Sequence, residues 1–457
     1  MPLTGHNPRS KRHQAKTYSR SASQMRQAFG LYISYTFRVT TISYPVQLRV
    51  NGDRLMQRLM DLAEIGSIDG GGCARLALTD EDKAGRDLVI AWMHDLGLSV
   101  TTDVIGNVVG VWDVGSGQPV MTGSHIDTVR TGGKYDGNLG VLAGLEVIQT
   151  LQENNITPQR PLAVAFFTNE EGARFAPDML GSLVYVGGMP IEEALEIVSI
   201  DGATVADELE RIGYNGATPC PAIAPHSFIE LHIEQGPVLE QEGIRIGAVT
   251  GVQGISWQEV VIDGQSNHAG TTPMSMRKDP ALVAAEITVF LRELALRMGG
   301  HQVCTVGKID LHPNLINVVP ARAILTLDVR NTDEQLLIQA ENEISDFLAK
   351  VAKEEQVSIS TRPLARFEPV QFADSVINMV HEIAIEHGHT VRYMPSGAGH
   401  DAQMLARVCP SGMIFVQSRD GISHNAAEYT SPEDIEAGSN ILLHSMLQMA
   451  QSEETFA

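Results

Sequence analysis

Side chains that bind metal ions occur in five short segments, each at the end of a predicted strand or in a predicted loop. They are His125 after PVMTGS, Asp136 in KYDGN, Glu171 after PLAVAFFT, His232 in FIELHIEQG and His424 in DGISHNAAE. Taken singly, each residue also suits an ordinary polar role, such as a helix cap for Asp136. A rigid sheet can nevertheless direct side chains at its strand ends into one pocket.

The adjacent pair Glu170 and Glu171 is hard to explain without a cation. Two neighbouring carboxylates directly after an apolar strand repel each other unless a positive charge compensates them. A pair of divalent ions needs one bridging carboxylate and about two further nitrogen or oxygen ligands each. The five residues supply that number, so the sequence predicts two divalent metal ions per subunit, either zinc or manganese, cobalt or nickel.

Two more carboxylates have predicted roles beside these ligands. Glu170 is not needed as a ligand, and a carboxylate next to two cations can take a proton from water, so we expect it to be the general base. Asp127 lies two residues after His125 and projects from the same side of an extended chain. We expect its carboxylate to bind the second imidazole nitrogen of His125 and fix the tautomer.

The elements that position these residues alternate between helical and strand patterns. Apolar residues recur at helical spacing in 53–65 and 80–97, and the apolar runs 107–112, 119–125 and 161–168 are typical of buried strands. A further helical stripe, predicted to pack on the sheet, consists of Leu139, Leu142, Leu145, Ile148 and Leu151.

The pattern changes after residue 252. Strands are predicted at 257–264, 304–311 and 323–330, with long helices near 279–298 and from about 333. The chain then returns to the first pattern, with a helix near 373–388, a strand at 412–417 and a last helix that Ser431 can cap. We therefore expect an α/β fold, in which a catalytic domain with a central mixed sheet flanked by helices is interrupted by a smaller α+β domain.

Composition limits the partners and the compartment. The 457 residues carry a net charge of -22, which repels phosphate backbones and argues against nucleic acid. No apolar run approaches the length of a membrane-spanning helix. The four cysteines are far apart, as expected in a reducing compartment, so the default location is cytoplasmic.

The first 52 residues differ from the rest, because they contain eight Lys or Arg and no Asp or Glu. This basic, acid-free composition is typical of an organelle transit peptide. A disordered basic tail and an upstream start codon explain it equally well. We treat residues 1–48 as a basic extension outside the fold.

At the level of whole motifs, the sequence resembles the hydantoinase/carbamoylase branch of the dinuclear-metal peptidase and amidohydrolase superfamily. The resemblance covers about residues 51–450. It rests on GSHIDTVRTGGKYDGNLGVLAGLE, FTNEEGARFAPDMLGS, ELHIEQGPVLE, NHAGTTPM and SGAGHDAQML. It implies a catalytic domain at 49–252 and 365–457, and a lid and dimerisation domain at 253–364 that joins a homodimer.

The resemblance also implies how the ligands divide. His125 and His232 would bind one metal, Glu171 and His424 the other, and Asp136 would bridge them. Glu170 would be the general base. Related peptidases usually have a carboxylate where this chain has His232, so that residue favours the non-peptidase branch.

Substrate contacts are expected mainly from the inserted domain. Alternation in AILTLDVR places Arg330 on the polar face at a strand end, where its planar fork can bind a carboxylate with two hydrogen bonds. By resemblance, Asn317 contacts substrate, and His268 reaches the neighbouring subunit's active site and polarises the scissile carbonyl. Gln235 is expected to contact the carbamoyl group.

The predicted activity is hydrolysis of an N-carbamoyl-L-amino acid, or of a ureido acid such as N-carbamoyl-β-alanine, to the amino acid, ammonia and carbon dioxide. Allantoate amidohydrolase is the nearest alternative because it shares every metal ligand. A dipeptidase or aminoacylase is a more distant one, which His232 disfavours. A metal-free binding protein would have no use for five ligands and a base.

Overall fold

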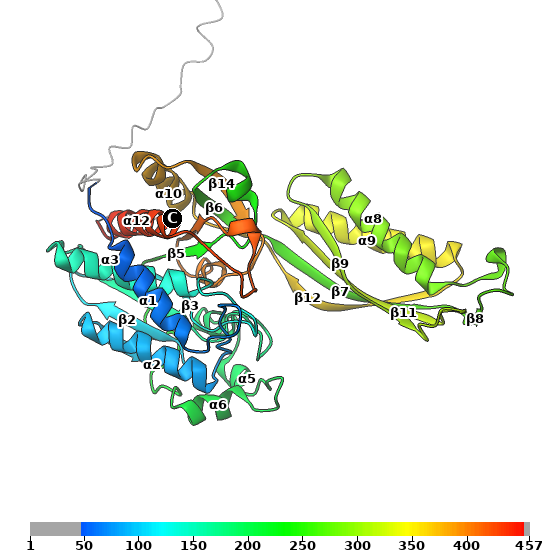
Figure 1. The fold of residues 1–457 in the computed structure, drawn as a ribbon, viewed down its shortest axis with the longest axis horizontal. Helices are drawn as coiled ribbons and strands as arrows, with labels where there is room; N and C mark the ends of the chain where they lie inside the picture. Colours follow the sequence, from blue (N-terminus) through cyan, green and yellow to red (C-terminus); the bar gives the residue numbers. More distant parts are fainter. Residues whose placement is uncertain (1–46, 452–457) are drawn as a thin grey trace, which may run out of the picture. The chain divides into compact units, whose positions relative to one another are not determined.

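A computed structural model of the chain describes residues 47–451 (Figure 1). The predicted basic extension, residues 1–48, lies outside this part except for its last two residues. Between residues 47 and 451, no helix is both long enough and apolar enough to cross a bilayer.

The larger sheet has nine strands, and the predicted ligands lie near the carboxyl ends of its central parallel strands. Its order is β1 (Ser99–Thr102), β2 (Val108–Trp112), β4 (Leu162–Phe167), β3 (Val120–His125), β5 (Ser227–Ile233), β15 (Ser411–Val416), β6 (Ile246–Val252) and β13 (Val370–Gln371), with β14 (Val391–Ser396) also beside β6. The strands β4, β3, β5 and β15 are parallel neighbours, whereas β2 and β6 are antiparallel to theirs. The sheet is therefore mixed, as expected.

Helices flank this sheet. They are α1 (Gly52–Glu64), α2 (Asp80–Asp95), α3 (Asn138–Glu153), α4 (Leu180–Tyr185), α5 (Ile191–Leu195), α6 (Val205–Ile212), α7 (Val238–Glu242), α10 (Asp374–Glu386), α11 (Asp401–Leu405) and α12 (Pro432–Gln451). Ser431 caps α12 as predicted, because its Oγ accepts from Asp434 N at 3.1 Å. The short turns Met274–Met276 (η1) and Arg419–Gly421 (η2) complete the set.

The helix α3 is more buried than its predicted stripe suggests. It packs against β3, β4 and β5, and the helices α1 and α12 cover its other side. Consequently residues outside the stripe, such as Val141 and Val147, are fully buried as well. Burial on every side is typical of a helix inside a large domain.

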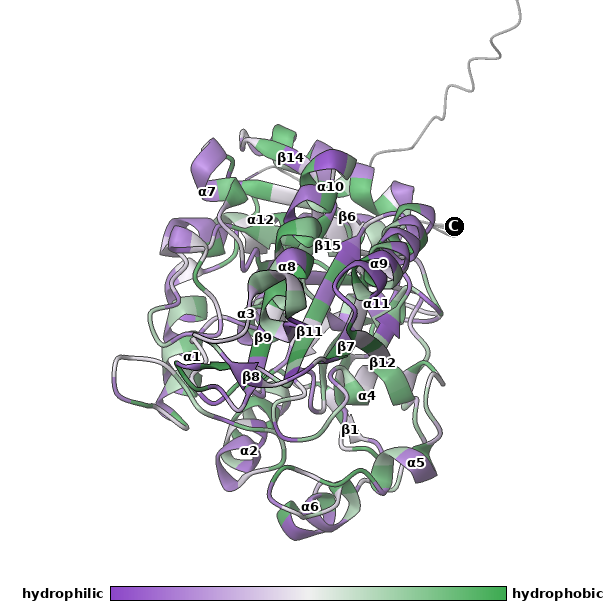
Figure 2. Cartoon of the chain, turned by 90° about the vertical axis from the view of Figure 1, so that its right-hand side faces the viewer, coloured by the Kyte–Doolittle hydropathy of each residue, from purple (hydrophilic) through white to green (hydrophobic). Residues whose placement is uncertain are grey.

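A second sheet lies in the segment between β6 and β13. Its order is β12 (Ser358–Phe367), β7 (Gly254–Asp263), β11 (Arg322–Asn331) and β9 (Val303–His312), and a separate ribbon pairs β8 (Asn267–His268) with β10 (Val318–Val319). The helices α8 (Pro280–Met298) and α9 (Glu334–Glu354) pack on this sheet. Hydrophilic residues, coloured purple in Figure 2, line part of α9, while Leu337, Ala340 and Ile344 form its buried side.

The register of β11 agrees with the predicted alternation. Leu325, Leu327 and Val329 are buried in the core that the sheet shares with α8 and α9. Arg330 and Asp328 are only partly buried and lie on the opposite face. Arg330 therefore reaches the polar side of the sheet.

Sequence patterns do not identify β12, although it is ten residues long. It is an edge strand with mostly exposed side chains, it contains Pro363, and its register with β7 shifts after that residue. An edge strand needs no apolar alternation and tolerates proline. It continues to Phe367, beyond the predicted boundary at 364, and the domain boundaries stay a prediction.

Candidate metal centre and active site

Parallel strands bring the predicted ligands to one edge of the large sheet. His125 is the last residue of β3 and pairs with Phe167, the last residue of β4, three residues before Glu170. His232 lies near the end of β5, the other neighbour of β3. Because the carboxyl ends of parallel strands meet at the same edge, these side chains lie close together.

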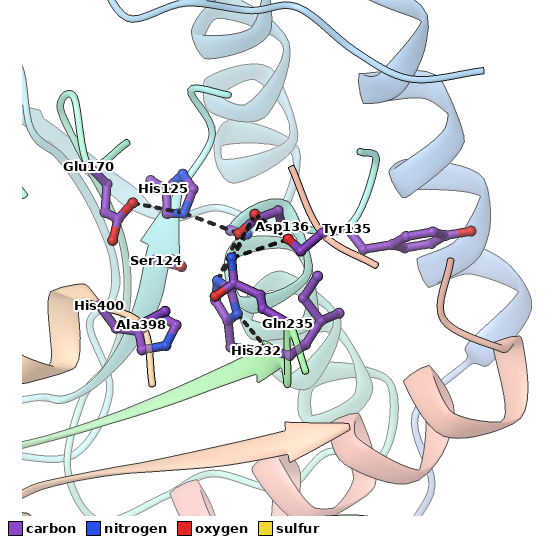
Figure 3. Close-up of polar contacts among 12 residues, drawn as sticks. Ser124, His125, Tyr135, Asp136, Glu170, His232, Gln235, Ala398 and His400 are labelled. Atoms are coloured by element: carbon purple, nitrogen blue, oxygen red, sulfur yellow. Dashed lines mark hydrogen bonds and ion pairs between the residues drawn. The ribbon is translucent and has the colours of Figure 1, made fainter. Parts of the chain in front are cut away.

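The carboxylate of Asp136 lies at the centre of the cluster (Figure 3). Its Oδ1 is 3.1 Å from His232 Nε2 and 3.7 Å from His125 Nε2. These three residues form one group of potential ligands. Gly137 makes this approach possible, since it has a φ of +66° and a Cβ there would lie 2.5 Å from the His125 ring.

A second group shares the same carboxylate. Asp136 Oδ2 is 3.4 Å from His424 Nε2, and Glu171 Oε2 is 3.2 Å from that nitrogen. The three residues form another group that could hold a metal ion. His424 is half exposed, with 51% of its side chain accessible, whereas Asp136 is buried. The structure thus brings all five predicted ligands together, with one carboxylate common to both groups.

Glu170 lies beside this cluster without belonging to either group. Its Oε2 is 3.4 Å from His125 Nε2, and the residue is 7% exposed (Figure 3). The turn after β4 separates it from Glu171, which faces His424. The two adjacent glutamates therefore have different surroundings, as the predicted division of roles requires.

The expected contact of the Asp127 carboxylate is wrong. His125 Nδ1 donates to the main-chain carbonyl of Asp127 at 2.9 Å. The carboxylate instead accepts from the backbone N–H groups of Glu170 and Glu171, each at 3.3 Å. The carboxylate takes this position because the buried N–H groups at the turn after β4 need an acceptor. Asp127 still fixes the tautomer of His125, through its carbonyl oxygen.

The electrostatics of the cluster follow from burial and opposing charges. Burial alone would raise the pKa of Asp136, but its hydrogen bond with His232 and the charges of the nearby histidines hold it below its usual range. The same contact raises the pKa of His232 to about 9, against the effect of burial. Burial, followed by the charges of Asp401 and Glu171, raises the pKa of Glu170 well above normal.

These residues line a pocket that opens to solvent, with about 400 Å³ of empty space. Its wall contains the five predicted ligands, Glu170 and Gln235, together with four residues that sequence reasoning did not single out. Those four are Asp178, Ala398, Gly399 and His400. His400 is buried, its ring centroid is 4.5 Å from that of His232, and its Nε2 is 2.9 Å from Ser396 Oγ. The sequence feature that could have identified His400 is its position at the start of a helix, directly after the glycines of SGAGHDAQML.

Glu428 connects the loops that carry Asp136 and His424. Its Oε1 accepts from the backbone N–H groups of Tyr135 and Asp136, and its Oε2 accepts from Ser423 Oγ at 3.1 Å. Sequence reasoning missed this residue, because nothing in the motif SHNAAEYT shows that its carboxylate turns inward.

Two of the predicted substrate residues lie at or near this pocket. Gln235 Nε2 donates to Asp136 Oδ2 at 3.0 Å. Arg330 is not part of the pocket wall, but its Nη1 donates to Gly397 O at 2.7 Å. Gly397 directly precedes the wall residues 398–400. Asp328 accepts from Arg330 Nε and Nη2 and so occupies that edge of the guanidinium. The other edge, formed by Nη1 and Nη2, does not face Asp328.

The other two lie together, away from the pocket wall. His268 and Asn317 are both exposed, and Ala269 N donates to Asn317 O at 2.9 Å across the β8–β10 ribbon. Neither residue lines the pocket of its own chain. A role in the pocket of a second subunit stays a prediction.

The donor set suits divalent cations. The Nδ1 atoms of His125 and His232 contact carbonyl oxygens, which only accept, so in the neutral rings Nδ1 carries the proton and the Nε2 lone pair faces Asp136. Within residues 47–451, no Lys or Arg forms an ion pair with Asp136, Glu170 or Glu171. Imidazole nitrogens and buried carboxylates gathered at these distances, with no Lys or Arg paired to them, form a donor set that a divalent cation stabilises.

Comparisons with known proteins agree with this geometry. Residues 121–448 match the peptidase family M20/M25/M40. The chain is 40% identical over 410 residues to an N-carbamoyl-L-amino acid amidohydrolase of Geobacillus stearothermophilus, covering 88% of this chain and all of that protein. It is 35% identical to an allantoate amidohydrolase of Bacillus subtilis, covering 85% and 95%. A hydantoinase/carbamoylase family amidase from Burkholderia multivorans superposes with a TM-score of 0.86 at 44% identity, covering 89% and 99%.

Fold and site together define a hydrolase that acts on C–N bonds. The chain belongs to the peptidase family M20/M25/M40, and the fold class expected from the sequence is confirmed. The resemblance to the hydantoinase/carbamoylase amidases is confirmed as well.

Proposed function

We propose that the enzyme hydrolyses the ureido C–N bond of an N-carbamoyl-L-amino acid, or of a related ureido acid, to the amino acid, ammonia and carbon dioxide. The observation that carries the proposal is the carboxylate of Asp136 shared by two ligand groups, with Glu170 beside them in the same pocket. The 40% identity to a carbamoyl-amino acid amidohydrolase over its whole length supports this substrate class.

Two divalent ions are part of the proposal. His125 and His232 would hold one, Glu171 and His424 the other, and Asp136 both. Bound there, the ions would supply Lewis-acid chemistry and acidify a water molecule. The mixed nitrogen and oxygen donors suit zinc, manganese, cobalt or nickel.

The chain's own residues would then move protons and orient groups. Glu170 takes a proton from the attacking water as its oxygen bonds to the ureido carbon. Glu170 returns that proton to the departing nitrogen as the C–N bond breaks, and the released carbamate decomposes to ammonia and carbon dioxide. Gln235, whose Nε2 donates to Asp136, would orient the carbamoyl group.

The inserted segment 253–364 would serve as lid and dimer contact. Arg330 would bind the substrate carboxylate through the edge that Asp328 leaves open. His268 and Asn317 would complete the site of the partner subunit in a homodimer. Their exposure, away from the pocket wall of their own chain, supports this assignment.

Ammonia release from a panel of substrates tests the function. The panel contains N-carbamoyl-L-amino acids, N-carbamoyl-β-alanine, allantoate and dipeptides. Chelator treatment should abolish activity, and each of the four metals should be tested for recovery. Cleavage of dipeptides alone, or full turnover by protein that elemental analysis shows to be metal-free, contradicts the proposal. Preference for allantoate would favour the second candidate, which the 35% identity to the Bacillus subtilis enzyme supports.

A further inference from the structure

A carboxylate with no proposed catalytic role lines the pocket. Asp178 lies in the segment between β4 and α4, and it forms part of the same wall as Glu170, Glu171 and His400. It is partly buried. The metal ligands and the general base account for the other carboxylates of the wall, so the function of Asp178 needs a separate explanation.

The backbone holds Asp178 in this position. Met179 N donates to Glu170 O at 2.7 Å, which folds the segment back onto the end of β4. Gly172 has a φ of +63°, and a Cβ there would lie 2.8 Å from the backbone of Asp178. The close approach therefore requires glycine and brings Asp178 next to the turn that carries Glu171.

The carboxylate of Asp178 is available to a ligand. Among the described residues its hydrogen-bond partner is its own backbone N–H, and no cation forms an ion pair with it. Arg330 is near enough to lower the pKa of Asp178, and Glu171 near enough to raise it, while burial has the largest effect and raises it. The guanidinium of Arg330 is nevertheless bonded to Asp328 and Gly397.

This arrangement constrains what a substrate can present. Asp178 shares the pocket wall with the ligand cluster and is near enough to Arg330 and Glu171 for their charges to act on it. A substrate that reaches from Arg330 to the ligand cluster would therefore pass beside Asp178. A carboxylate accepts hydrogen bonds from N–H and O–H groups and repels other carboxylates. An aliphatic substituent of the substrate next to Asp178 would offer no hydrogen-bond donor to its carboxylate.

We propose that Asp178 determines specificity by accepting a hydrogen bond from the α-substituent of the substrate. The enzyme then prefers ureido acids whose substituent carries an N–H donor over aliphatic ones, and discriminates against acidic ones. This inference rests on the proposed function and names the substrate class within it.

Three substrates of nearly equal shape test the inference. N-carbamoyl-L-asparagine, N-carbamoyl-L-leucine and N-carbamoyl-L-aspartate differ in presenting a donor, an apolar group or a negative charge. The wild type should have the highest kcat/KM for the asparagine compound and the lowest for the aspartate compound. The change Asp178→Asn should raise the aspartate-to-leucine ratio about tenfold, and Asp178→Ala should lower the asparagine-to-leucine ratio about tenfold.

Binding and a matched control separate specificity from general damage. Calorimetric binding of the three compounds to Glu170→Gln protein, with and without Asp178→Asn, should show the same changes in ratio. Metal content and melting temperature should stay at the wild-type values. Glu193→Gln removes an exposed carboxylate of α5 outside the pocket and should leave every ratio unchanged.

The outcomes distinguish this inference from the proposed function. Ratios that stay within twofold of wild type in both Asp178 variants, on substrates that the enzyme hydrolyses, overturn the inference alone. Failure of the wild type to release ammonia from any ureido acid overturns the proposed function. If Asp178→Ala does not fold, the shape-conserving Asp178→Asn variant decides the question through the aspartate-to-leucine ratio.

Discussion

Glu170 and Glu171 are neighbours in the chain, but their side chains contact different partners. Glu171 belongs to the group that His424 and Asp136 complete, whereas Glu170 faces His125 from outside both groups. A ligand that loses its charge weakens metal binding, while a general base that loses its charge stops proton transfer. The two residues should therefore differ in what their replacement removes.

Glu170→Gln keeps the size of the side chain and removes the proton acceptor. We expect turnover to fall about 100- to 10,000-fold with metal content near that of the wild type. Glu171→Gln should lower both turnover and metal content. Steady-state kinetics and elemental analysis of the same preparations check this. Equal loss of metal in both variants, or an active Glu170→Gln enzyme, would contradict the assignment.

Arg330→Lys replaces a planar fork with a single point charge. Asp328 occupies one edge of the fork, so a lysine could not bind Asp328, Gly397 and a substrate carboxylate at once. We expect kcat/KM for ureido acids to fall roughly tenfold or more, with unchanged metal content. Arg362→Lys, at an exposed position of β12 in the same sheet, is the control and should have little effect. Equal kinetics for both variants would exclude Arg330 as the carboxylate contact.

At the residue scale, the sequence predicted side chains at strand ends better than it predicted orientations. The five residues of the two candidate ligand groups could be singled out because each follows a buried strand or lies in a glycine-rich loop. The prediction named the wrong atom of Asp127 as the partner of His125. The carboxylate points to the backbone N–H groups at the turn after β4 instead, and the main-chain carbonyl contacts His125. Asp178 and Glu428 could not be found, since only folded-back loops bring them inward.

At the scale of elements, three histidines meet where α10 ends and α12 passes. The rings of His387 and His444 are 4.4 Å apart, and His389 follows in the turn before β14. Burial, followed by the charge of His444 and then those of Arg49 and His389, lowers the pKa of His387 to about 4. Burial also lowers the pKa values of His389 and His444. The charge of Asp434 opposes this at His389, and the hydrogen bond to Leu48 O, followed by the charge of Glu386, opposes it at His444.

These shifts predict a loss of stability in mild acid. An unfolded histidine has a pKa of about 6.5, so between about pH 6.5 and pH 4 the unfolded chain binds more protons than the folded one. Stability that these neutral histidines contribute is therefore present above pH 6.5 and lost as the pH falls. His387→Gln should flatten the fall of the melting temperature between pH 7 and pH 5, whereas His94→Gln, at an exposed position, should follow the wild type. Identical slopes for all three proteins would show that this cluster does not control acid stability.

The predictability of elements followed their burial. The buried strands β3 and β4 and the helix α3 have strong apolar patterns, and the sequence indicated all of them. The edge strand β12 and the short helices α4, α5 and α6 were missed. Their sequences either lack alternation or are too short to show a period, and contacts with the rest of the fold determine them.

At the scale of the whole molecule, the pocket contains the five predicted ligands and the predicted base, but two predicted substrate residues lie elsewhere. His268 and Asn317 are exposed on the β8–β10 ribbon of the inserted segment. A homodimer in which the ribbon of one subunit reaches the pocket of the other would complete both sites. Every active site would then need Glu170 from one chain and His268 from its partner.

Mixing two inactive variants tests that arrangement. His268→Ala and Glu170→Gln chains should each form dimers of very low activity. A heterodimer of the two has one site in which an intact Glu170 meets an intact His268, because these residues come from different chains. With random exchange of subunits, half the dimers are mixed and half their sites are competent, so activity should recover to about a quarter of the wild-type value.

The recovery is interpretable only if exchange is measured. Differently tagged subunits allow the heterodimers to be purified and their fraction to be counted, and each variant incubated with itself supplies the background. If each site were built from one chain, every site of a heterodimer would contain either His268→Ala or Glu170→Gln. Verified heterodimers would then regain no activity. Pure heterodimers with no recovery would therefore show that His268 serves its own subunit. Half of the wild-type activity in the heterodimers, with an inactive His268→Ala homodimer, would establish that the site is built from two chains.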